Sequence, residues 1–240
     1  MIRNTEGIVL KTAIYGEADL IVTYLSKDFG IVKAFAKSPR KITSRFGSSL
    51  EPLTYSKIAL LGKENISLPR LTRSDIIKSF NDLRENINCF IELSEIIKMN
   101  LSLIHEGSTV KELFDLLYKT LIYLQQGYDR AMYLLFYKIK FLERTGYMPN
   151  LDVCGLCGRE IKKFSNNSIN FHINHGSILC NNCSSFESKA ININKSSLVF
   201  YSALRNWHIQ KLSRLSAHPS VLIELSQTIN AHIGFITAKK

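Results

Sequence analysis

The sequence predicts a mixed α+β protein in which a small five-stranded β-barrel precedes an α-helical domain that carries a four-cysteine insert. Three observations support this fold class. Apolar residues alternate with a period of two before residue 80 and recur with a helical period after it, and two Cys-x-x-Cys pairs interrupt the helical pattern. The predicted ranges are 1–79 for the barrel, 80–240 for the helical domain and about 149–188 for the insert.

Five short apolar segments before residue 80 are predicted to be strands. The first four are separated by turn-forming stretches, GEAD, KDFG and SPRKITSRFGSSLEP. The predicted strands are Gly7–Tyr15, Leu20–Leu25, Ile31–Ala36, Tyr55–Leu61 and Ile66–Ser74. Five strands in a basic module of this size fit a closed barrel of the OB type, which binds oligonucleotides with its face and loops. An SH3-like barrel would give a similar pattern.

The first predicted strand alternates between two faces. One face holds Ile8, Leu10, Thr12 and Ile14, and the other holds Val9, Lys11, Ala13 and Tyr15. The same alternation, applied to the third strand, would place Phe35 in the barrel core.

Helical periodicity begins after Ser79. The first helix is predicted to present one apolar side, formed by Leu83, Ile87, Phe90, Ile97, Leu101 and Ile104, and the second to present Val110, Leu113, Leu117, Leu121 and Leu124. A third, largely buried helix starts at Arg130, and Gly107, Gly127 and Gly146 stand where C-terminal caps need a positive φ. After the insert, one helix is predicted over 195–215. Another begins at Pro219, with Leu222, Leu225, Ile229 and Ile233 in register.

Charge is distributed unevenly along the chain. The net charge is +11, from 31 Lys and Arg against 20 Asp and Glu. Residues 1–80 hold 13 basic and 7 acidic side chains, residues 81–150 hold 8 and 9, and residues 151–240 hold 10 and 4. Two basic ends favour a polyanionic partner, and nucleic acid is the commonest polyanion of the cytoplasm. A basic protein without such a partner is the alternative.

Targeting and membrane segments are not expected. No early basic segment leads into an apolar run with a cleavage site, and no run of about 18 uncharged apolar residues occurs. The sequence therefore predicts a cytoplasmic protein without a membrane partner.

The cysteines predict one structural zinc ion. Cys154 and Cys157 are followed, after 22 residues, by Cys180 and Cys183, a spacing close to that of zinc ribbons. Four thiolates complete a tetrahedron and leave no position for a reactive water. In a competing arrangement, His172 and His175 would replace one cysteine pair and leave an open position. Cys89, among apolar neighbours, is predicted to be a buried, inert thiol.

Motifs of several enzyme classes are missing from the sequence. It has no phosphate-binding loop, dinucleotide fingerprint, nucleophile elbow or zinc-protease motif. Glu17 and Asp19 form a close acidic pair, but two acids in a turn are more often solvated or capping than metal-binding. The chain is therefore not expected to be an enzyme. The alternatives are a zinc-dependent enzyme that processes nucleic acid and a zinc-ribbon transcription or RNA-binding factor.

Candidate nucleic-acid contacts lie in the basic segment 33–52. It holds five cations before its first acid, Glu51, and these are Lys33, Lys37, Arg40, Lys41 and Arg45. Phe35 and Phe46 lie among them. Cations along a loop can follow phosphates, and aromatic faces can stack on unpaired bases. Lys11, Arg70 and Arg73 would extend the patch if they share its face. The alternative is a solvated loop with Phe35 in the core.

A second candidate site is an apolar ridge near the end of the chain. Phe200, Leu204 and Trp207 follow one another at helical spacing, with Arg205, Lys211 and Arg214 nearby. Core packing explains such a ridge. The sharper hypothesis is a groove for a short acidic peptide with an apolar end.

Taken together, these stretches resemble the RecO family of bacterial DNA repair and recombination mediators, nearly from end to end. The resemblance rests on GIVLKTAIYGEADLIVTYLSKDFG, KAFAKSPRKITSRFGSSLEPL, LFDLLYKTL, GYMPNLDVCGLCGRE with the later CNNC, and HIGF, all in the family's order.

The resemblance implies an N-terminal OB-fold, a helical C-terminal domain and a zinc site formed by the four cysteines. It implies binding of single- and double-stranded DNA, annealing of complementary strands, and contact with the acidic C-terminal tail of the single-strand-binding protein. With RecR, and often RecF, such proteins help load RecA recombinase without hydrolysing a nucleotide, and a nucleoid-associated cytoplasmic location follows. The basic residues from Lys33 to Arg45 carry over as DNA contacts, whereas the tail pocket does not carry over residue by residue.

Overall fold

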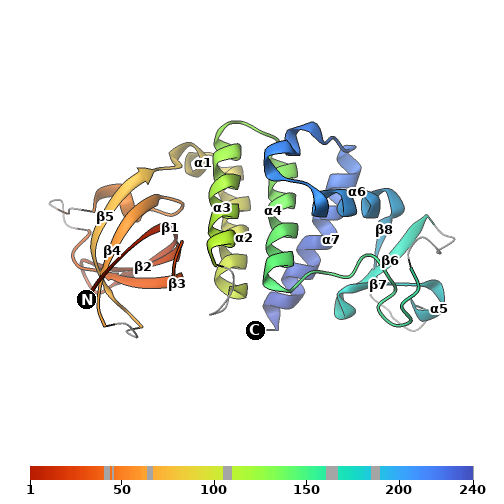
Figure 1. The fold of residues 1–240 in the computed structure, drawn as a ribbon, viewed down its shortest axis with the longest axis horizontal. Helices are drawn as coiled ribbons and strands as arrows, with labels where there is room; N and C mark the ends of the chain where they lie inside the picture. Colours follow the sequence, from red (N-terminus) through yellow and green to blue (C-terminus); the bar gives the residue numbers. More distant parts are fainter. Residues whose placement is uncertain are drawn as a thin grey trace. The chain divides into compact units, whose positions relative to one another are not determined.

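A computed structural model describes residues 1–40, 44, 46–63, 67–104, 110–160, 167–184 and 190–239 of the chain. These residues form two compact units, Met1–Gln126 and Gly127–Lys240. The first contains a five-stranded barrel and three helices, and the second contains helices and a small three-stranded sheet (Figure 1). The predicted α+β fold class, with a barrel followed by helices, is confirmed. No helix within the described ranges is long and apolar enough to cross a membrane.

The barrel closes through five strands in the order β1-β2-β3-β5-β4. The strands are β1 (Ile2–Tyr15), β2 (Asp19–Ser26), β3 (Gly30–Ala36), β4 (Tyr55–Leu61) and β5 (Arg70–Lys78). Neighbouring pairs are antiparallel except β3 and β5, which run parallel where the barrel closes. The fifth strand starts at Arg70 rather than at Ile66, which lies outside the described residues. Pro69 stands immediately before this strand, where its lack of an N–H removes no ladder hydrogen bond. Its carbonyl accepts from the Phe35 N–H at 2.8 Å.

A β-bulge in β1 changes which side chains point into the barrel. Val9 pairs with Tyr24, but the next paired residue is Lys11, opposite Thr23, so Leu10 is an extra residue in the ladder. Because one extra residue reverses the alternation, Val9 shares the inner face with Thr12 rather than with Lys11. The uninterrupted alternation predicted for this strand was therefore wrong across Leu10.

The barrel interior is filled by side chains from all five strands and from the connection between β3 and β4. The core cluster contains Val9, Val22, Tyr24, Ala34, Ala36, Phe46, Leu50, Ile58, Leu60 and Leu71. Burial of Tyr24 keeps its phenol uncharged and raises the pKa well above its usual value. The closed interior leaves only the outer surface for ligands.

Three helices complete the first unit, namely α1 (Asn81–Glu85), α2 (Ile87–Leu103) and α3 (Val110–Gln125). Helix α2 packs on β1 and α3 on β2. Tyr55 of β4 packs against Phe114 and Tyr118 of α3, with ring centroids 5.7 and 4.9 Å away. The helices thus cover one end of the outer barrel surface.

The first predicted helix is in fact two helices. Asn86 interrupts the run, and its side-chain oxygen accepts from the Cys89 N–H at 3.0 Å, which caps α2. The predicted apolar side of α2 is right for Ile97, which is buried, and wrong for Ile87, which is 74% exposed. The buried side instead holds Cys89, Leu93, Ile96, Ile97, Met99, Asn100 and Leu103. Cys89 is buried, as predicted.

The second unit packs three long helices against one another, α4 (Arg130–Thr145), α6 (Lys195–Asn206) and α7 (Pro219–Ala238). Gly127 and Gly146 adopt positive φ, as their cap positions require, whereas Gly107 lies outside the described residues. The predicted helix over 195–215 divides at Trp207, the C-cap of α6, and continues as a 3-10 helix, η4 (Ile209–Arg214).

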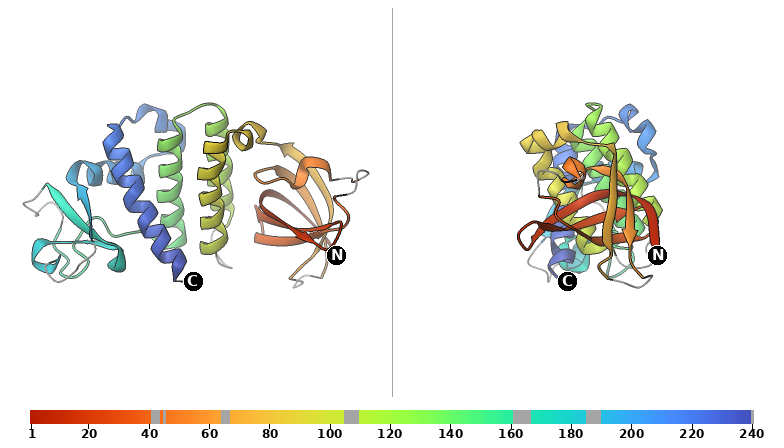
Figure 2. Two further views of the ribbon diagram at one scale, coloured as in Figure 1. Left: turned by 180° about the vertical axis from the view of Figure 1, so that it is seen from behind. Right: turned by 90° about the vertical axis from the view of Figure 1, so that its left-hand side faces the viewer.

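The insert of the second unit contains a three-stranded antiparallel sheet in the order β7-β6-β8 (Figure 2). Its elements are β6 (Ser168–His172), η3 (Ile173–His175), β7 (Ser177–Leu179), α5 (Asn181–Ser184) and β8 (Ala190–Asn194). The predicted boundary at residue 79 falls where the strands of the barrel end. Helices α1 to α3 group with the barrel in one compact unit. The division into domains at residue 79 stays a prediction.

The Arg84 side chain joins α1 to the β3–β4 connection. Its guanidinium donates to the Pro52 carbonyl and to Thr54 Oγ1, both at 2.9 Å, and pairs with Glu51 at 2.6 Å. Only 14% of the side chain is exposed.

Since hydrogen bonds from a charged donor are worth more than neutral ones, Arg84→Met should lower the free energy of unfolding by about 2 kcal/mol in chemical denaturation. Arg73→Met, which breaks the exposed pair with Asp75, should cost at most about 0.5 kcal/mol. Equal losses would contradict the structural role of Arg84.

Candidate metal centre and nucleic-acid interface

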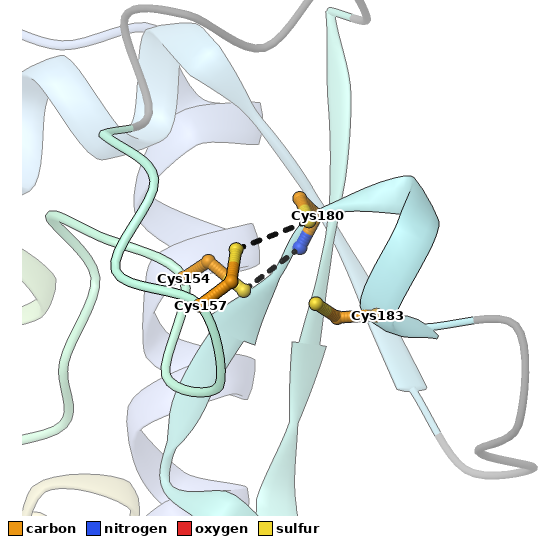
Figure 3. A group of neighbouring side chains, drawn as sticks. All are labelled: Cys154, Cys157, Cys180 and Cys183. Atoms are coloured by element: carbon orange, nitrogen blue, oxygen red, sulfur yellow. Dashed lines mark hydrogen bonds between the residues drawn. The ribbon is translucent and has the colours of Figure 1, made fainter.

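Four sulfur atoms converge at one end of the insert sheet (Figure 3). The Sγ atoms of Cys154, Cys157, Cys180 and Cys183 all lie within 4.8 Å of one another. Cys157 Sγ and Cys180 Sγ are 3.7 Å apart. A tetrahedral ion with metal–sulfur bonds of about 2.3 Å separates its sulfurs by about 3.8 Å, so the arrangement fits a four-thiolate metal site.

Two tight turns bring these sulfurs together. In the first, the Gly158 N–H donates to the Cys154 carbonyl at 2.9 Å, and Gly158 has φ of 71°, which a side chain would strain. Gly155 approaches β7 so closely that an added Cβ would lie 2.0 Å from Ser177 Oγ. In the second turn, the Cys183 N–H donates to the Cys180 carbonyl at 2.9 Å. The two glycines are therefore required by the fold of the first turn.

The electrostatics of the cluster favour the thiolate of Cys154 and oppose that of Cys183. Burial disfavours the Cys154 thiolate, but the backbone N–H groups of Cys180, Cys157 and Leu156 outweigh it and lower the Cys154 pKa to about 6. The neighbouring Cys180 side chain, followed by burial, raises the pKa of Cys183 to about 12. Four thiolates this close repel one another, so a divalent cation would have to supply the compensating charge and would displace protons on binding.

Neither histidine of the insert belongs to the sulfur cluster. His172 ends β6 and is buried, whereas His175 lies in η3 and is exposed. Within the described part of the chain, the metal-ligating group consists of the four cysteines alone. The competing arrangement with two histidine ligands is therefore not the one that the fold assembles.

His232 of α7 holds the insert sheet in place. Its Nε2–H donates to the Tyr147 carbonyl at 2.9 Å, and its ring meets Phe171 of β6 edge to face, with centroids 6.1 Å apart. An added Cβ at Gly176 would lie 3.0 Å from His232 Cε1, so the turn after η3 rests directly on the imidazole. Burial lowers the pKa of His232, although the contact with Tyr147 opposes this, so the ring is held neutral.

On the barrel, strands β1, β2 and β3 and the start of β5 present a face that the described helices leave open. Lys11, Thr23 and Lys33 pair across β1, β2 and β3; both lysines are exposed, whereas Thr23 between them is only 6% exposed. The adjacent row of the same face pairs Ala13, Ile21, Phe35 and Arg70 across β1, β2, β3 and β5. Side chains of paired residues point to the same side of a sheet. We call these residues, with Tyr15, the open face, which includes three of the predicted nucleic-acid contacts, Lys11, Lys33 and Arg70.

The open face carries one aromatic pair. Tyr15 is 54% exposed and Phe35 is half-buried, and their rings meet edge to face with centroids 5.8 Å apart. Phe35 does not enter the barrel core, because its neighbours Ala34 and Ala36 occupy the inner face. The alternative that buried Phe35 was therefore wrong. Phe46, in contrast, is 4% exposed and belongs to the core, so it cannot stack on a base.

The start of the basic segment folds back onto the β1–β2 turn. Asp19 Oδ1 accepts from the Ser38 N–H at 2.6 Å, and Arg40 donates to the Glu17 carbonyl at 2.9 Å. Asp19 therefore stabilises a turn, in agreement with the capping role expected for the Glu17 and Asp19 pair, and no group of three or more potential metal ligands in the described ranges includes either residue. Lys37 is exposed beside this turn. Lys41 and Arg45 lie outside the described residues.

Arg73 lies apart from the open face. It pairs with Asp75 at 2.5 Å and lines a polar hollow of about 600 Å³. Other side chains around this hollow are Asn4, Thr5, Glu6, Lys27, Asp28 and Lys57. Because the hollow mixes both signs of charge, it offers phosphates less attraction than the open face does.

The residues of the predicted peptide groove do not form one exposed ridge. Leu204 is fully buried and Phe200 is 9% exposed, so both belong to the core. Trp207 follows the end of α6 and donates to the Lys211 carbonyl at 2.8 Å. Arg205 pairs with Asp152 at 2.7 Å. Helix α6 ends before Trp207, which is why the helical spacing did not continue.

Sequence reasoning missed two members of the open face, Tyr15 and Ile21. Alternation had already placed Tyr15 with Lys11 and Ala13, and that grouping is the one the structure has. The partners across the strands could not be found in the same way, because cross-strand register is a long-range property.

A closed OB-type barrel with an exposed cationic face, joined to a helical unit that holds a four-cysteine cluster, defines a class of OB-fold proteins with an accessory four-cysteine insert. Family models narrow this class. The model for the N-terminal part of recombination protein O matches residues 1–80, and the model for its C-terminal part matches residues 93–236. The chain therefore belongs to the RecO family.

Individual relatives agree with this assignment. A protein of Thermodesulfovibrio yellowstonii, described as DNA repair protein RecO, is 40% identical over 235 residues, which cover 96% of this chain and 91% of that protein. Proteins of the same description from Syntrophus aciditrophicus and Dehalococcoides mccartyi are 32% and 28% identical, over 75% and 99% of this chain and 69% and 91% of theirs. The resemblance found in the sequence is confirmed.

Removing one sulfur should abolish metal binding. In Cys157→Ser, the bound metal should fall from about one ion per chain towards none in elemental analysis, because a tetrahedral site loses a quarter of its ligands. Thermal unfolding of the second unit should also shift to lower temperature, since metal binding is coupled to folding. Cys89→Ala, outside the cluster, is the control and should keep the metal. Full metal content in Cys157→Ser would contradict the four-sulfur site.

Acidification should destabilise the protein through His232. Its pKa in the folded protein lies below the usual 6.5, so the unfolded chain takes up the proton first. The stabilisation is complete above pH 6.5 and is lost as the pH falls towards the folded-state pKa, by at most about 1.4 kcal/mol per pH unit. His232→Gln keeps a donor for the Tyr147 carbonyl but does not titrate, so its unfolding free energy should depend less on pH between 7.5 and 5.5. His175→Gln, at an exposed site, should behave like the parent protein; identical slopes in all three would contradict this role.

Proposed function

We propose that the protein is a non-enzymatic, DNA-binding recombination mediator in DNA repair. Membership of the RecO family supports the role in repair, and relatives across several bacteria carry the description DNA repair protein. The observation that carries the DNA-binding part is the open face. It puts three cations and an aromatic pair on and beside the β2–β3 surface that OB-type barrels use for oligonucleotides.

The open face is suited to phosphates because the cations on it and the neighbouring Lys37 are uncommitted. Within the described residues, Lys11, Lys33, Lys37 and Arg70 are exposed and form no ion pair. Exposed cations gain from neutralising phosphates and releasing condensed counterions, and this gain does not depend on base sequence. Both single and double strands would therefore bind, with Arg40, Lys41 and Arg45 extending the contact along the basic segment.

We propose that the four cysteines hold one structural zinc ion. Zinc prefers sulfur ligands in a tetrahedron, and the sulfur spacing of 3.7 Å between Cys157 and Cys180 supports this choice. Four protein ligands leave no position for a substrate or a water. The ion would stabilise the turns of the insert, and the DNA contacts would act without breaking bonds.

The remaining steps follow the family resemblance. We propose that the protein anneals complementary strands, since cations on the barrel reduce the repulsion between two phosphate chains. Annealing would take place on DNA coated with single-strand-binding protein, whose acidic tail would dock on the helical domain. RecR, with RecF in many cases, would act with it to load RecA recombinase in the nucleoid-associated cytoplasm.

Neutralising exposed cations on and beside the open face should weaken the salt dependence of DNA binding. The triple change Lys11→Gln, Lys33→Gln and Lys37→Gln should reduce the slope of log affinity against log salt by about 2 for single strands and about 2.7 for duplex. Fluorescence anisotropy over a range of salt concentrations measures both slopes.

A matched control changes three exposed lysines on the helices of the same unit, Lys98, Lys111 and Lys119, also to Gln. The net charge changes equally, so a general charge effect would lower both slopes by the same amount. An unchanged slope in the open-face variant would reject the proposed contact. Strand annealing with and without a coat of single-strand-binding protein tests the mediator role. The annealing rate of the parent protein and of both variants should not change when ATP is added.

A further inference from the structure

We infer that the Tyr15–Phe35 pair is a stacking platform for unpaired bases, by which the barrel distinguishes single-stranded from double-stranded nucleic acid. The inference rests on the proposed DNA-binding function of the open face and assigns a specificity within it. Charge alone attracts any phosphate chain, so a preference for unpaired strands needs a group that reads the bases. Aromatic rings serve this purpose because every base offers a π-face, whatever its identity.

The two rings are available because the barrel turns them outward at an uncovered end. Ile8 and Leu25 pair across β1 and β2 on the helix-covered part of the barrel, and both are fully buried. Towards the other end of the same two strands, Ala13 and Tyr15 are exposed. The aromatic pair therefore lies where the cover has ended and the three-strand surface is open.

The pair also has a fixed geometry before any ligand binds. Phe35 is half-buried and stands between Ile21 on β2 and Arg70 on β5, its partners in the two neighbouring ladders. The Tyr15 ring meets it at an interplanar angle of 85°. An edge-to-face pair leaves a face of at least one ring free for a third aromatic group, and strands hold the rings with little loss of side-chain entropy on binding.

Cations border the platform on two sides. Lys33 and Lys37 lie two residues before and after Phe35 on the chain, and Arg70 is its partner on β5. Lys11 and Lys33 share a cross-strand row two strands apart, which corresponds to roughly 10 Å. A strand whose bases stack on the rings would therefore place its phosphates beside these cations. Grooves that bind single strands combine aromatic rings and cations in the same way.

Duplex DNA cannot use the platform without losing base pairing. Its bases are stacked on one another and only their edges face the grooves, so a ring on an open sheet surface meets phosphates and sugars instead. The cations serve both forms, whereas the rings serve only the unpaired one. Replacing one ring should therefore change the ratio of single-strand affinity to duplex affinity, rather than weaken both affinities equally.

A purely structural role for the pair makes a different prediction. If the rings only stabilise the strands, as cross-strand aromatic pairs do, their loss would lower the unfolding temperature and weaken both forms of DNA equally. Base-stacking would leave duplex affinity as it was.

The experiment compares Tyr15→Leu and Phe35→Leu with the full-length parent protein. Each variant should bind a single-stranded 20-mer about tenfold more weakly at fixed salt, and a duplex of the same sequence less than twofold more weakly. Phe29→Leu is the matched control, because Phe29 is 42% exposed on the same barrel but lies beside Arg3, away from the open face. It should change neither affinity.

A second measurement uses the parent protein first, so that its main result does not depend on a variant being folded. Oligonucleotides with abasic sites keep every phosphate but remove the bases, so the parent protein should bind them about tenfold more weakly than the intact strand. Phe35→Leu should bind both with similar affinity. Equal binding of abasic and intact strands by the parent protein, or equal loss on single strands and duplex in the variants, overturns the platform and leaves the cationic face standing. Failure of the parent protein to bind either DNA overturns the proposed function itself.

Discussion

One extra residue in β1 determines what the barrel shows to its surroundings. Leu10 has no partner in the β1–β2 ladder. Because this extra residue shifts the alternation, Lys11 points to the opposite side of the sheet from Val9, whereas in a regular strand the two would share a side. Val9 fills the core, and Lys11, Ala13 and Tyr15 emerge on the outside. Without the bulge, either a lysine would enter the barrel or Val9 would leave the core. The charge and the aromatic ring on the open face both depend on this local shift.

Helix packing then separates the outer surface of the barrel into two parts. The covered part buries Ile8, Leu25 and Tyr55 beneath α2 and α3, and apolar contacts there stabilise the first unit. The uncovered part keeps cations that would be costly to bury. A single sheet thus serves stability at one end and ligand access at the other, because its outer side chains change from apolar to basic along the strands.

The four-sulfur site and the open face place opposite demands on their side chains. The cysteines are held by short turns, by glycines that allow close approach and by backbone N–H groups, all of which favour a closed, rigid centre. The lysines of the open face are exposed, and a long side chain on a strand can adjust to a flexible phosphate chain. The cysteines are therefore held rigidly by the fold, whereas the exposed lysines keep mobile side chains.

By itself the sequence determined the order of barrel and helices, the cluster of four cysteines, the buried Cys89 and the family, because periodicity, cysteine spacing and motif order are local properties. Helix ends at Gly127 and Gly146 were also predictable, since a C-terminal cap needs a residue that tolerates positive φ. Tertiary structure alone decided that Phe35 faces outward while Phe46 is buried, that Arg73 stands apart from Arg70, and that Leu204 belongs to a core. These outcomes depend on a bulge, on register between distant strands and on which surface a helix covers, and such contacts are not encoded in the spacing of neighbouring residues.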